Sequence, residues 1–271
     1  MRRRPFLPIL LALALLATAC DKEQGPLQVR DNAFTWSDVM PAGATLAVRS
    51  MQGDIEVVVG TDDTARVTAR IEWRRGNPDE TLRMSGSRQG SDALICAVWG
   101  EGSCSIADYD AKLHTKATDA KVYFKVTVPP GVKLDLLEIN GNVSASASAP
   151  VKARTMNGDV RVATAVGPVE AETMNGSVDI RMASIAGADS VIGKTLNGDV
   201  FIYLPDPSDA LVDLGVTNGS VSTDFPVMMT GEASKRSIRG TLGVGGRTVH
   251  ARSMNGQVAL RRLAADGTSA P

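Results

Sequence analysis

One short phrase recurs along the chain: Thr155-Met-Asn157-Gly-Asp-Val160, Thr173-Met-Asn175-Gly-Ser-Val178 and Thr195-Leu-Asn197-Gly-Asp-Val200. It returns as Val216-Thr-Asn218-Gly-Ser-Val221 and Ser253-Met-Asn255-Gly-Gln-Val258, with looser copies at 138–143 and 50–55. The asparagines from Asn140 to Asn218 follow one another at steps of 17, 18, 22 and 21 residues. Self-similarity with a period near 20 residues is the signature of a solenoid, in which each repeat forms one turn of a coil.

Apolar and polar residues alternate on both sides of each Asn-Gly pair. Around Asn175 the apolar positions are Val169, Ala171, Val178 and Ile180, and polar or charged residues stand between them. A period of two residues is typical of a strand with one buried face. Asn-Gly supplies the corner because glycine readily adopts positive φ. Each unit is therefore predicted to contain two short, half-buried strands.

Asn-Gly is also a strong hairpin signal, so an antiparallel meander is the competing interpretation. A parallel solenoid is favoured because its equivalent residues stack about 4.8 Å apart, whereas a meander has no need of the same residue at every corner. The stacked corner residues are predicted to form an amide ladder that satisfies buried backbone groups; they are Asn140, Asn157, Asn175, Asn197, Asn218 and Asn255. Opposite charges on neighbouring strands attract, and two columns alternate in sign: Arg154, Glu172 and Lys194, then Arg161 and Asp179.

The predicted fold is all-β: a parallel β-solenoid, or β-helix, of short two-strand rungs over 130–262, preceded by a less regular β region over 35–129. Residues 20–34 are polar and aperiodic, which indicates a tether, and 263–271 form a small, polar tail that is expected to be flexible. Few aromatic residues and 26 glycines agree with strands joined by many turns.

The first 19 residues are predicted to be a lipoprotein signal peptide. Arg2, Arg3 and Arg4 precede a short apolar run, and Leu15-Leu-Ala-Thr-Ala-Cys20 resembles a bacterial lipobox. Cleavage before Cys20 would attach fatty acid to this cysteine, whereas an ordinary signal peptide that ends near a cysteine is the alternative. The expected location is the bacterial cell envelope, with the protein anchored in a membrane by lipid and its folded part extracytoplasmic.

Without that segment, 26 basic residues (29 less the three arginines) face 30 acidic ones, a net charge of −4. This balance argues against nucleic acid as a partner. The remaining cysteines, Cys96 and Cys104, flank a Gly-Glu-Gly turn and are predicted to form a structural disulfide. A redox-active pair is disfavoured because such pairs are usually spaced Cys-x-x-Cys.

No familiar catalytic or phosphate-binding motif is present, and we predict no catalytic, cofactor-binding or metal-ligating residue. Asp54, Asp159 and Asp199 hold equivalent corner positions that suggest calcium, but Ser177 and Ser220 interrupt the series, which favours corner hydrogen bonding. The alternating charges of the outer columns also disfavour a polysaccharide hydrolase or lyase. The apolar residues that precede each corner allow an exposed adhesive stripe, but burial is predicted for them; they are Met51, Met156, Met174, Leu196 and Met254.

The strand 121–131 with its Pro-Pro-Gly stop, the Asn-Gly repeats and the Gly-rich 240–246 segment together resemble the bacterial "putative adhesin" family. The resemblance covers roughly residues 40–262. It implies a β-solenoid domain of unknown function in the cell envelope, with no established catalytic residue.

These observations predict a non-enzymatic binding or scaffold protein, anchored by lipid, that presents a solenoid surface to an unidentified envelope protein or surface ligand. An enzyme acting on envelope glycans and a structural spacer without a ligand are the alternatives.

Overall fold

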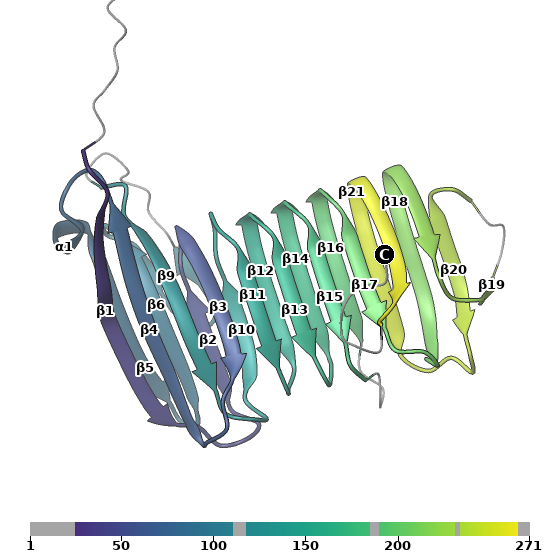
Figure 1. Cartoon of the computed structure of the whole chain (residues 1–271), viewed down its shortest axis with the longest axis horizontal. Helices are drawn as coiled ribbons and strands as arrows, with labels where there is room; N and C mark the ends of the chain where they lie inside the picture. The colour runs from purple at the N-terminus through teal and green to yellow at the C-terminus, as the bar shows by residue number, and fades with distance from the viewer. Residues whose placement is uncertain (1–24, 111–117, 185–189, 231–233, 265–271) are drawn as a thin grey trace, which may run out of the picture.

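Short strands follow one another in the pairs that the repeat predicts (Figure 1). The computed structural model describes residues 25–110, 118–184, 190–230 and 234–264. The first elements are β1 (Gln28–Val39), β2 (Thr45–Arg49), β3 (Gly53–Val59), β4 (Thr64–Trp73), α1 (Pro78–Thr81), β5 (Leu82–Gln89), β6 (Asp92–Trp99), β7 (Ser103–Cys104), β8 (Tyr109–Asp110) and β9 (Lys121–Val128). The repeat region contributes β10 (Lys133–Leu137), β11 (Val143–Ala147), β12 (Val151–Asn157), β13 (Val160–Thr164), β14 (Val169–Asn175), β15 (Val178–Met182), β16 (Val191–Asn197) and β17 (Val200–Leu204). The last elements are β18 (Ala210–Thr223), β19 (Val227–Met229), β20 (Ser237–Leu242) and β21 (Thr248–Arg262).

Two strands and the corner between them make one rung, and the rungs stack in parallel register. β12, β14 and β16 pair in that order, which aligns Val151, Val169 and Val191. β13, β15 and β17 do the same on the other side of the coil, which aligns Val160, Val178 and Val200. The predicted parallel β-solenoid of two-strand rungs is confirmed, and so is the predicted register of the two charge columns.

At both ends of the coil the order in space departs from the order in the chain. β2 and β3 form a rung that stacks on β10 and β11, although about 90 residues separate them. Next to this rung, β6 continues the layer of first strands, and β9, β4 and β1 continue the layer of second strands. At the other end the C-terminal strand β21 lies between the β16–β17 rung and β18, as Figure 1 shows. The antiparallel strands β20 and β19 follow β18.

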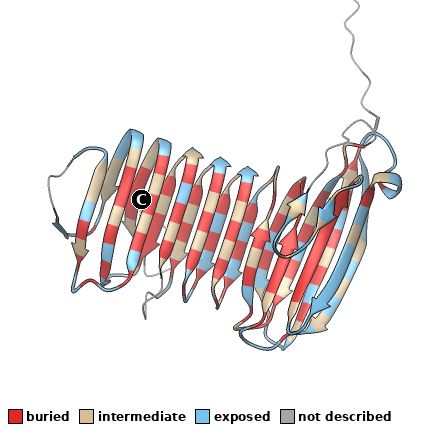
Figure 2. Cartoon of the chain, turned by 180° about the vertical axis from the view of Figure 1, so that it is seen from behind, coloured by how far each residue is buried: buried red, intermediate tan, exposed pale blue. Residues whose placement is uncertain are grey.

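The core lies between the two layers of strands. Burial alternates along the strands of the repeat region, so buried bands run across the rungs in Figure 2. Val160, Val178 and Val200 are fully buried in one column. A methyl group placed on Gly193 of the facing layer would lie only 2.8 Å from a methyl of Val200, closer than two carbon atoms can pack, so the two layers leave no room for a larger residue there. Stacked Val and Ile residues fill this part of the interior, whereas buried aromatic residues such as Phe124 and Phe225 lie toward the two ends of the coil.

The N-terminal strand begins earlier than the sequence indicates. β1 starts at Gln28, inside the segment 20–34 that we predicted as a tether, and pairs antiparallel with β4. None of its residues is fully buried, so it has little of the apolar alternation by which a strand is recognised. At the other end, Leu263 donates a backbone hydrogen bond to Leu204 at 2.7 Å, while 265–271 lie outside the described residues. Within the described part of the chain, no helix has the length and apolar character to cross a membrane.

Candidate functional site: an outer groove at the first rungs

The corner asparagines form the predicted amide ladder, but it does not serve buried backbone groups. Each side-chain amide donates to the side-chain carbonyl of the neighbouring rung over 2.7–2.9 Å, in the order Asn218, Asn255, Asn197, Asn175, Asn157 and Asn140. All six residues are exposed, because the alternation of buried and exposed residues ends at the corner. The ladder therefore holds neighbouring rungs in register at the surface.

Two other columns satisfy the corner backbone. The hydroxyls of Thr155, Thr173 and Thr195 donate to the glycine carbonyl of the preceding rung at 2.8–2.9 Å. After most of the corner glycines, an Asp, Asn or Ser side chain accepts from the backbone N–H of the next rung, as Asp159 does from Ser177 at 2.9 Å. Corner hydrogen bonding by these residues is thus confirmed. Among the described residues, no cluster of three or more His, Cys, Asp or Glu side chains has an arrangement suited to a metal ion.

The residues that precede the corners are exposed, and the prediction of burial is wrong for most of them. Met156, Met174 and Met254 are 44–46% exposed and Leu196 is half-buried, whereas Met51 is buried as predicted. Before Asn157, Asn175, Asn197 and Asn255, the inward position belongs to a buried threonine or serine. The residue before the asparagine therefore falls on the outward phase of the strand alternation.

The disulfide Cys96–Cys104 is present, and Cys20 lies outside the described residues. The disulfide attaches the β7–β8 hairpin to the outer side of β6. There the phenol of Tyr109 donates to the carbonyl of Ala97 at 2.6 Å, and the guanidinium of Arg49 donates to the carbonyl of Ile106 at 2.8 Å. The hairpin covers Leu94 and Val98, which would otherwise be exposed on this face. The disulfide is structural.

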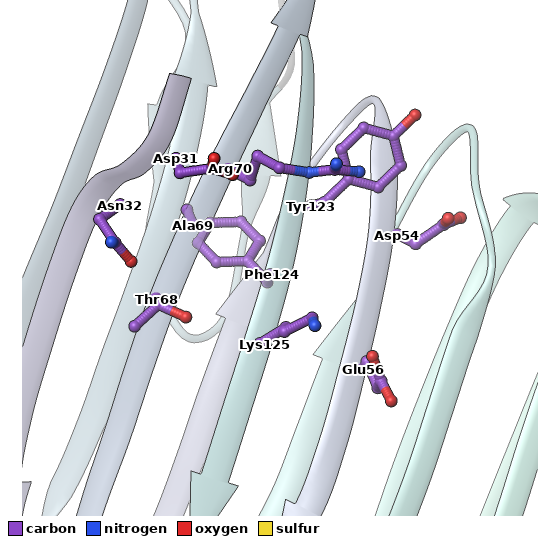
Figure 3. Close-up of a pocket in the computed structure, with 10 residues that line it drawn as sticks. All are labelled: Asp31, Asn32, Asp54, Glu56, Thr68, Ala69, Arg70, Tyr123, Phe124 and Lys125. Atoms are coloured by element: carbon purple, nitrogen blue, oxygen red, sulfur yellow. The ribbon is translucent and has the colours of Figure 1, made fainter. Parts of the chain in front are cut away.

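A hollow lies on the outer side of the other layer of strands, at its N-terminal end. We call it the N-terminal groove; its volume is about 660 Å³. Its floor comes from β4 and β9, one wall from β1 and the other from β3 (Figure 3). The polar side chains that line it are Asp31, Asn32, Asp54, Glu56, Thr68, Arg70, Tyr123 and Lys125.

The strand register brings these side chains together. Tyr123 of β9 stands opposite Arg70 of β4 on one side and Asp54 of β3 on the other. Lys125 stands in the same way between Thr68 and Glu56. Outward residues on adjacent strands lie about 5 Å apart. Two rows of polar groups therefore cross three hydrogen-bonded strands.

At one end of the groove an arginine is stacked on a tyrosine. The guanidinium carbon of Arg70 lies 4.9 Å from the ring centroid of Tyr123, and Arg70 forms an ion pair with Glu72 at 2.8 Å. Burial and the neighbouring Glu72 carboxylate raise the pKa of Tyr123. The phenol therefore stays protonated at neutral pH, and because its proton faces Glu72, its oxygen is available as an acceptor.

The wall from β1 is an irregular segment. The pairing of β1 with β4 shifts between Arg30 and Phe34, and the residues in between bulge opposite Arg70. Asn32, in this bulge, has a φ of +49°, which is uncommon for a residue other than glycine. Bulges re-aim side chains and are frequent next to functional sites. Here the bulge places Asp31 and Asn32 at the rim of the groove.

Sequence analysis did not find this groove. The alternation in Lys121-Val-Tyr-Phe-Lys does place Tyr123 and Lys125 on an outer face. Each strand alone, however, has the pattern of an ordinary solvated surface. Only the pairing of β1, β4, β9 and β3, which are not consecutive repeats, brings the polar side chains together.

Comparisons with known proteins give remote likenesses. One crystal structure, of a "putative cell adhesion protein" from Clostridium sporogenes, is 10% identical, with a TM-score of 0.45, and the match covers 86% of this chain and 100% of that one. Another, of a "putative adhesin" from Bacteroides fragilis, is 11% identical, with a TM-score of 0.37 and coverage of 86% and 97%. No curated protein matches the chain. The family model described as Toastrack DUF4097 matches residues 104–261, more than half of the chain, and the protein belongs to this family.

Proposed function

We propose that the protein is a lipid-anchored binding protein of the bacterial cell envelope, whose N-terminal groove receives its ligand. The observation that carries this proposal is the groove itself. Eight polar side chains line one hollow, and the regular ladders of β3, β9 and β4 supply the backbone positions of six of them. Such a site is largely formed before the ligand arrives, so little ordering opposes binding.

The signal at Leu15–Cys20 supports anchoring, and the position of the groove fits it. Asp31, at the rim, is eleven positions after Cys20. Even a fully extended chain of that length spans at most about 40 Å. A lipid on Cys20 would therefore keep the groove close to the membrane surface, and the ligand would be a component that is accessible there.

A glycan-active enzyme is the second candidate, because the groove brings together three carboxylates. Asp31, Asp54 and Glu56 come from two separate walls of it. Glycoside hydrolysis uses two carboxyl groups on opposite sides of one bond. Incubation of the purified protein with envelope glycans and analysis of the products by mass spectrometry tests this activity. Cleavage that Glu56→Gln abolishes would replace the binding proposal with an enzymatic one.

The anchor is tested by labelling cells with a fatty acid analogue. The wild-type protein is expected to carry the label and to fractionate with membranes. Cys20→Ala is expected to abolish both, and Cys96→Ala with Cys104→Ala is the matched control that retains them. Continued labelling of Cys20→Ala would overturn the lipoprotein assignment.

The binding role of the groove is tested by photo-cross-linking in intact cells. A photoreactive residue replaces Thr68 on the floor of the groove, and in a control it replaces Ser146, which is outward on β11 of the same layer. An adduct is expected at position 68 and not at position 146. No adduct at either position, or the same adducts at both, would favour a spacer without a specific ligand.

A further inference from the structure

The lining of the N-terminal groove limits the chemistry of what it binds. Asp31, Asp54, Glu56 and the Tyr123 oxygen accept hydrogen bonds, Arg70 and Lys125 donate them, and Asn32 and Thr68 do both. The formal charge of this set is −1, so it disfavours an anion. The two apolar residues of the lining, Ala69 and Phe124, are each only 1% exposed, so the apolar surface of the groove comes from the stems and rings of its polar residues and not from an open apolar pocket. A suitable ligand is rich in groups that both donate and accept hydrogen bonds, and it carries no acidic group.

Hydroxyl groups on a compact ring meet these requirements. We infer that the N-terminal groove is a saccharide-binding site for neutral or amino sugars, which deepens the proposed function and rests on it. A saccharide hydroxyl can accept from Lys125 or Arg70 and at the same time donate to Glu56 or Asp54. The volume of about 660 Å³ lies within the range of small-molecule sites, about 300–1,000 Å³.

The stacked pair supplies a flat surface beside these polar groups. Arg70 is held over the ring of Tyr123 and tied to Glu72, so the platform is fixed before a ligand arrives. The C–H face of a sugar ring can pack on such a planar surface while its hydroxyls reach the rows of Lys125 and Asp54. A peptide would gain less, because the lining offers no apolar pocket for its side chains.

The same chemistry can come from a soluble glycan or from the head group of a membrane glycolipid. The short distance along the chain between Cys20 and the rim makes both accessible if Cys20 is lipidated. The sugar is what the groove recognises in either case.

The test uses the protein expressed from its complete sequence, purified and applied to an array of neutral, amino and acidic saccharides. Binding is expected for neutral or amino saccharides and not for acidic ones. A second arm measures co-sedimentation with phosphatidylethanolamine vesicles that contain or lack a neutral glycolipid. Co-sedimentation of the protein with glycolipid vesicles, in addition to binding on the array, indicates that the ligand is a membrane glycolipid. Binding on the array alone indicates a soluble glycan.

Matched variants separate the groove from the rest of the surface. Arg70→Ala is expected to weaken saccharide binding at least tenfold. Arg181→Ala is the control, because Arg181 stacks on Tyr203 at the same 4.9 Å on the same layer but outside the groove. Asp31→Asn combined with Glu56→Gln keeps the shape of the lining and removes two negative charges, so it is expected to admit acidic saccharides.

Three results would overturn the inference: no saccharide bound by the folded wild-type protein, preference for acidic saccharides, or equal losses in Arg70→Ala and Arg181→Ala. Cross-linking at position 68 to a protein without glycan, together with no saccharide bound on the array, would refute saccharide recognition and leave the binding role of the groove intact. Fatty acid labelling of Cys20→Ala would refute the anchor and leave binding to soluble saccharides intact.

Discussion

At the scale of the residue, Glu138 departs from the pattern of its column. It occupies the inward corner position that Thr155 holds in the next rung, and it is fully buried. Its Oε1 accepts from the backbone N–H of Ile139 at 3.1 Å, and burial raises its pKa to about 8. The carboxyl group is therefore largely neutral in the folded protein at neutral pH.

This shift predicts that stability falls as pH rises. The unfolded chain releases the Glu138 proton near its ordinary pKa of about 4.5, whereas the folded protein keeps it up to about 8. Between these values the native state binds the extra proton, so the free energy of unfolding decreases by up to a few kcal/mol and then levels off. Glu138→Gln is expected to remove this slope and to be more stable than wild type above about pH 8. Urea denaturation between these pH values measures the free energy of unfolding, and Glu170→Gln on the outer face is the control. Equal slopes in the wild type and Glu138→Gln would contradict the raised pKa of Glu138.

Two adjacent residues of β15 test the register of the coil. Val178 is fully buried between Val160 and Val200, whereas Asp179 faces outward and pairs with Arg181 at 2.9 Å. Val178→Asp is expected to lower stability by several kcal/mol, because it places a carboxyl group in an apolar column. Asp179→Val is expected to cost about 1 kcal/mol or less, the usual value of a surface ion pair. Thermal melts compare the two; a greater loss from Asp179→Val would mean that the strand is one residue out of register.

At the scale of the element, the corner requires glycine for a reason beyond its conformation. Gly176 has a φ of +149°, and a methyl group there would lie 2.0 Å from the carbonyl oxygen of Gly158 in the neighbouring rung. The same close approach recurs at Gly158 and Gly198. Corner glycines thus set how closely consecutive rungs can stack.

A pair of alanine variants separates close approach from backbone strain. Gly246 also has a positive φ, of +118°, but no atom lies within 4 Å of a methyl group placed there. Gly246→Ala is expected to cost about 1 kcal/mol through backbone strain. Gly176→Ala is expected to cost several times more, because the rungs must move apart as well. Denaturation midpoints measure the stability of both variants. Equal losses would show that the positive φ alone accounts for the need for glycine at the corner.

At the scale of the whole molecule, local repetition determines what the sequence can predict. The run from Asn140 to Asn197 repeats closely, so its strands, corners and register follow from alternation and stacking. The ends do not, because β3 meets β11 and β21 meets β16 across long stretches of chain. The groove depends on those distant pairings and on the bulge of β1, which has no repeated counterpart. The exposure of the corner methionines, in contrast, is predictable from the sequence. Each follows an inward threonine or serine, so strand alternation turns it outward.

The position of β21 makes the far end of the coil depend on the last strand of the chain. β21 pairs with β16 and β17 on one side and with β18 on the other. Its residues Val249, Ala251, Val258 and Leu260 are fully buried in the continuous core. A chain that ends before Thr248 would leave β16, β17 and β18 without this partner and would expose their apolar columns.

We therefore expect that removing residues 248–271 destabilises everything from β16 onward, whereas removing only 265–271 has little effect. Limited proteolysis with mass spectrometry measures this, because unpaired strands become accessible to protease. New cleavage sites should appear within 191–223 in the longer truncation and be absent in the shorter one. Protection of that segment without β21 would show that β18 can close onto β16 directly, so that the inserted strand is dispensable for the coil.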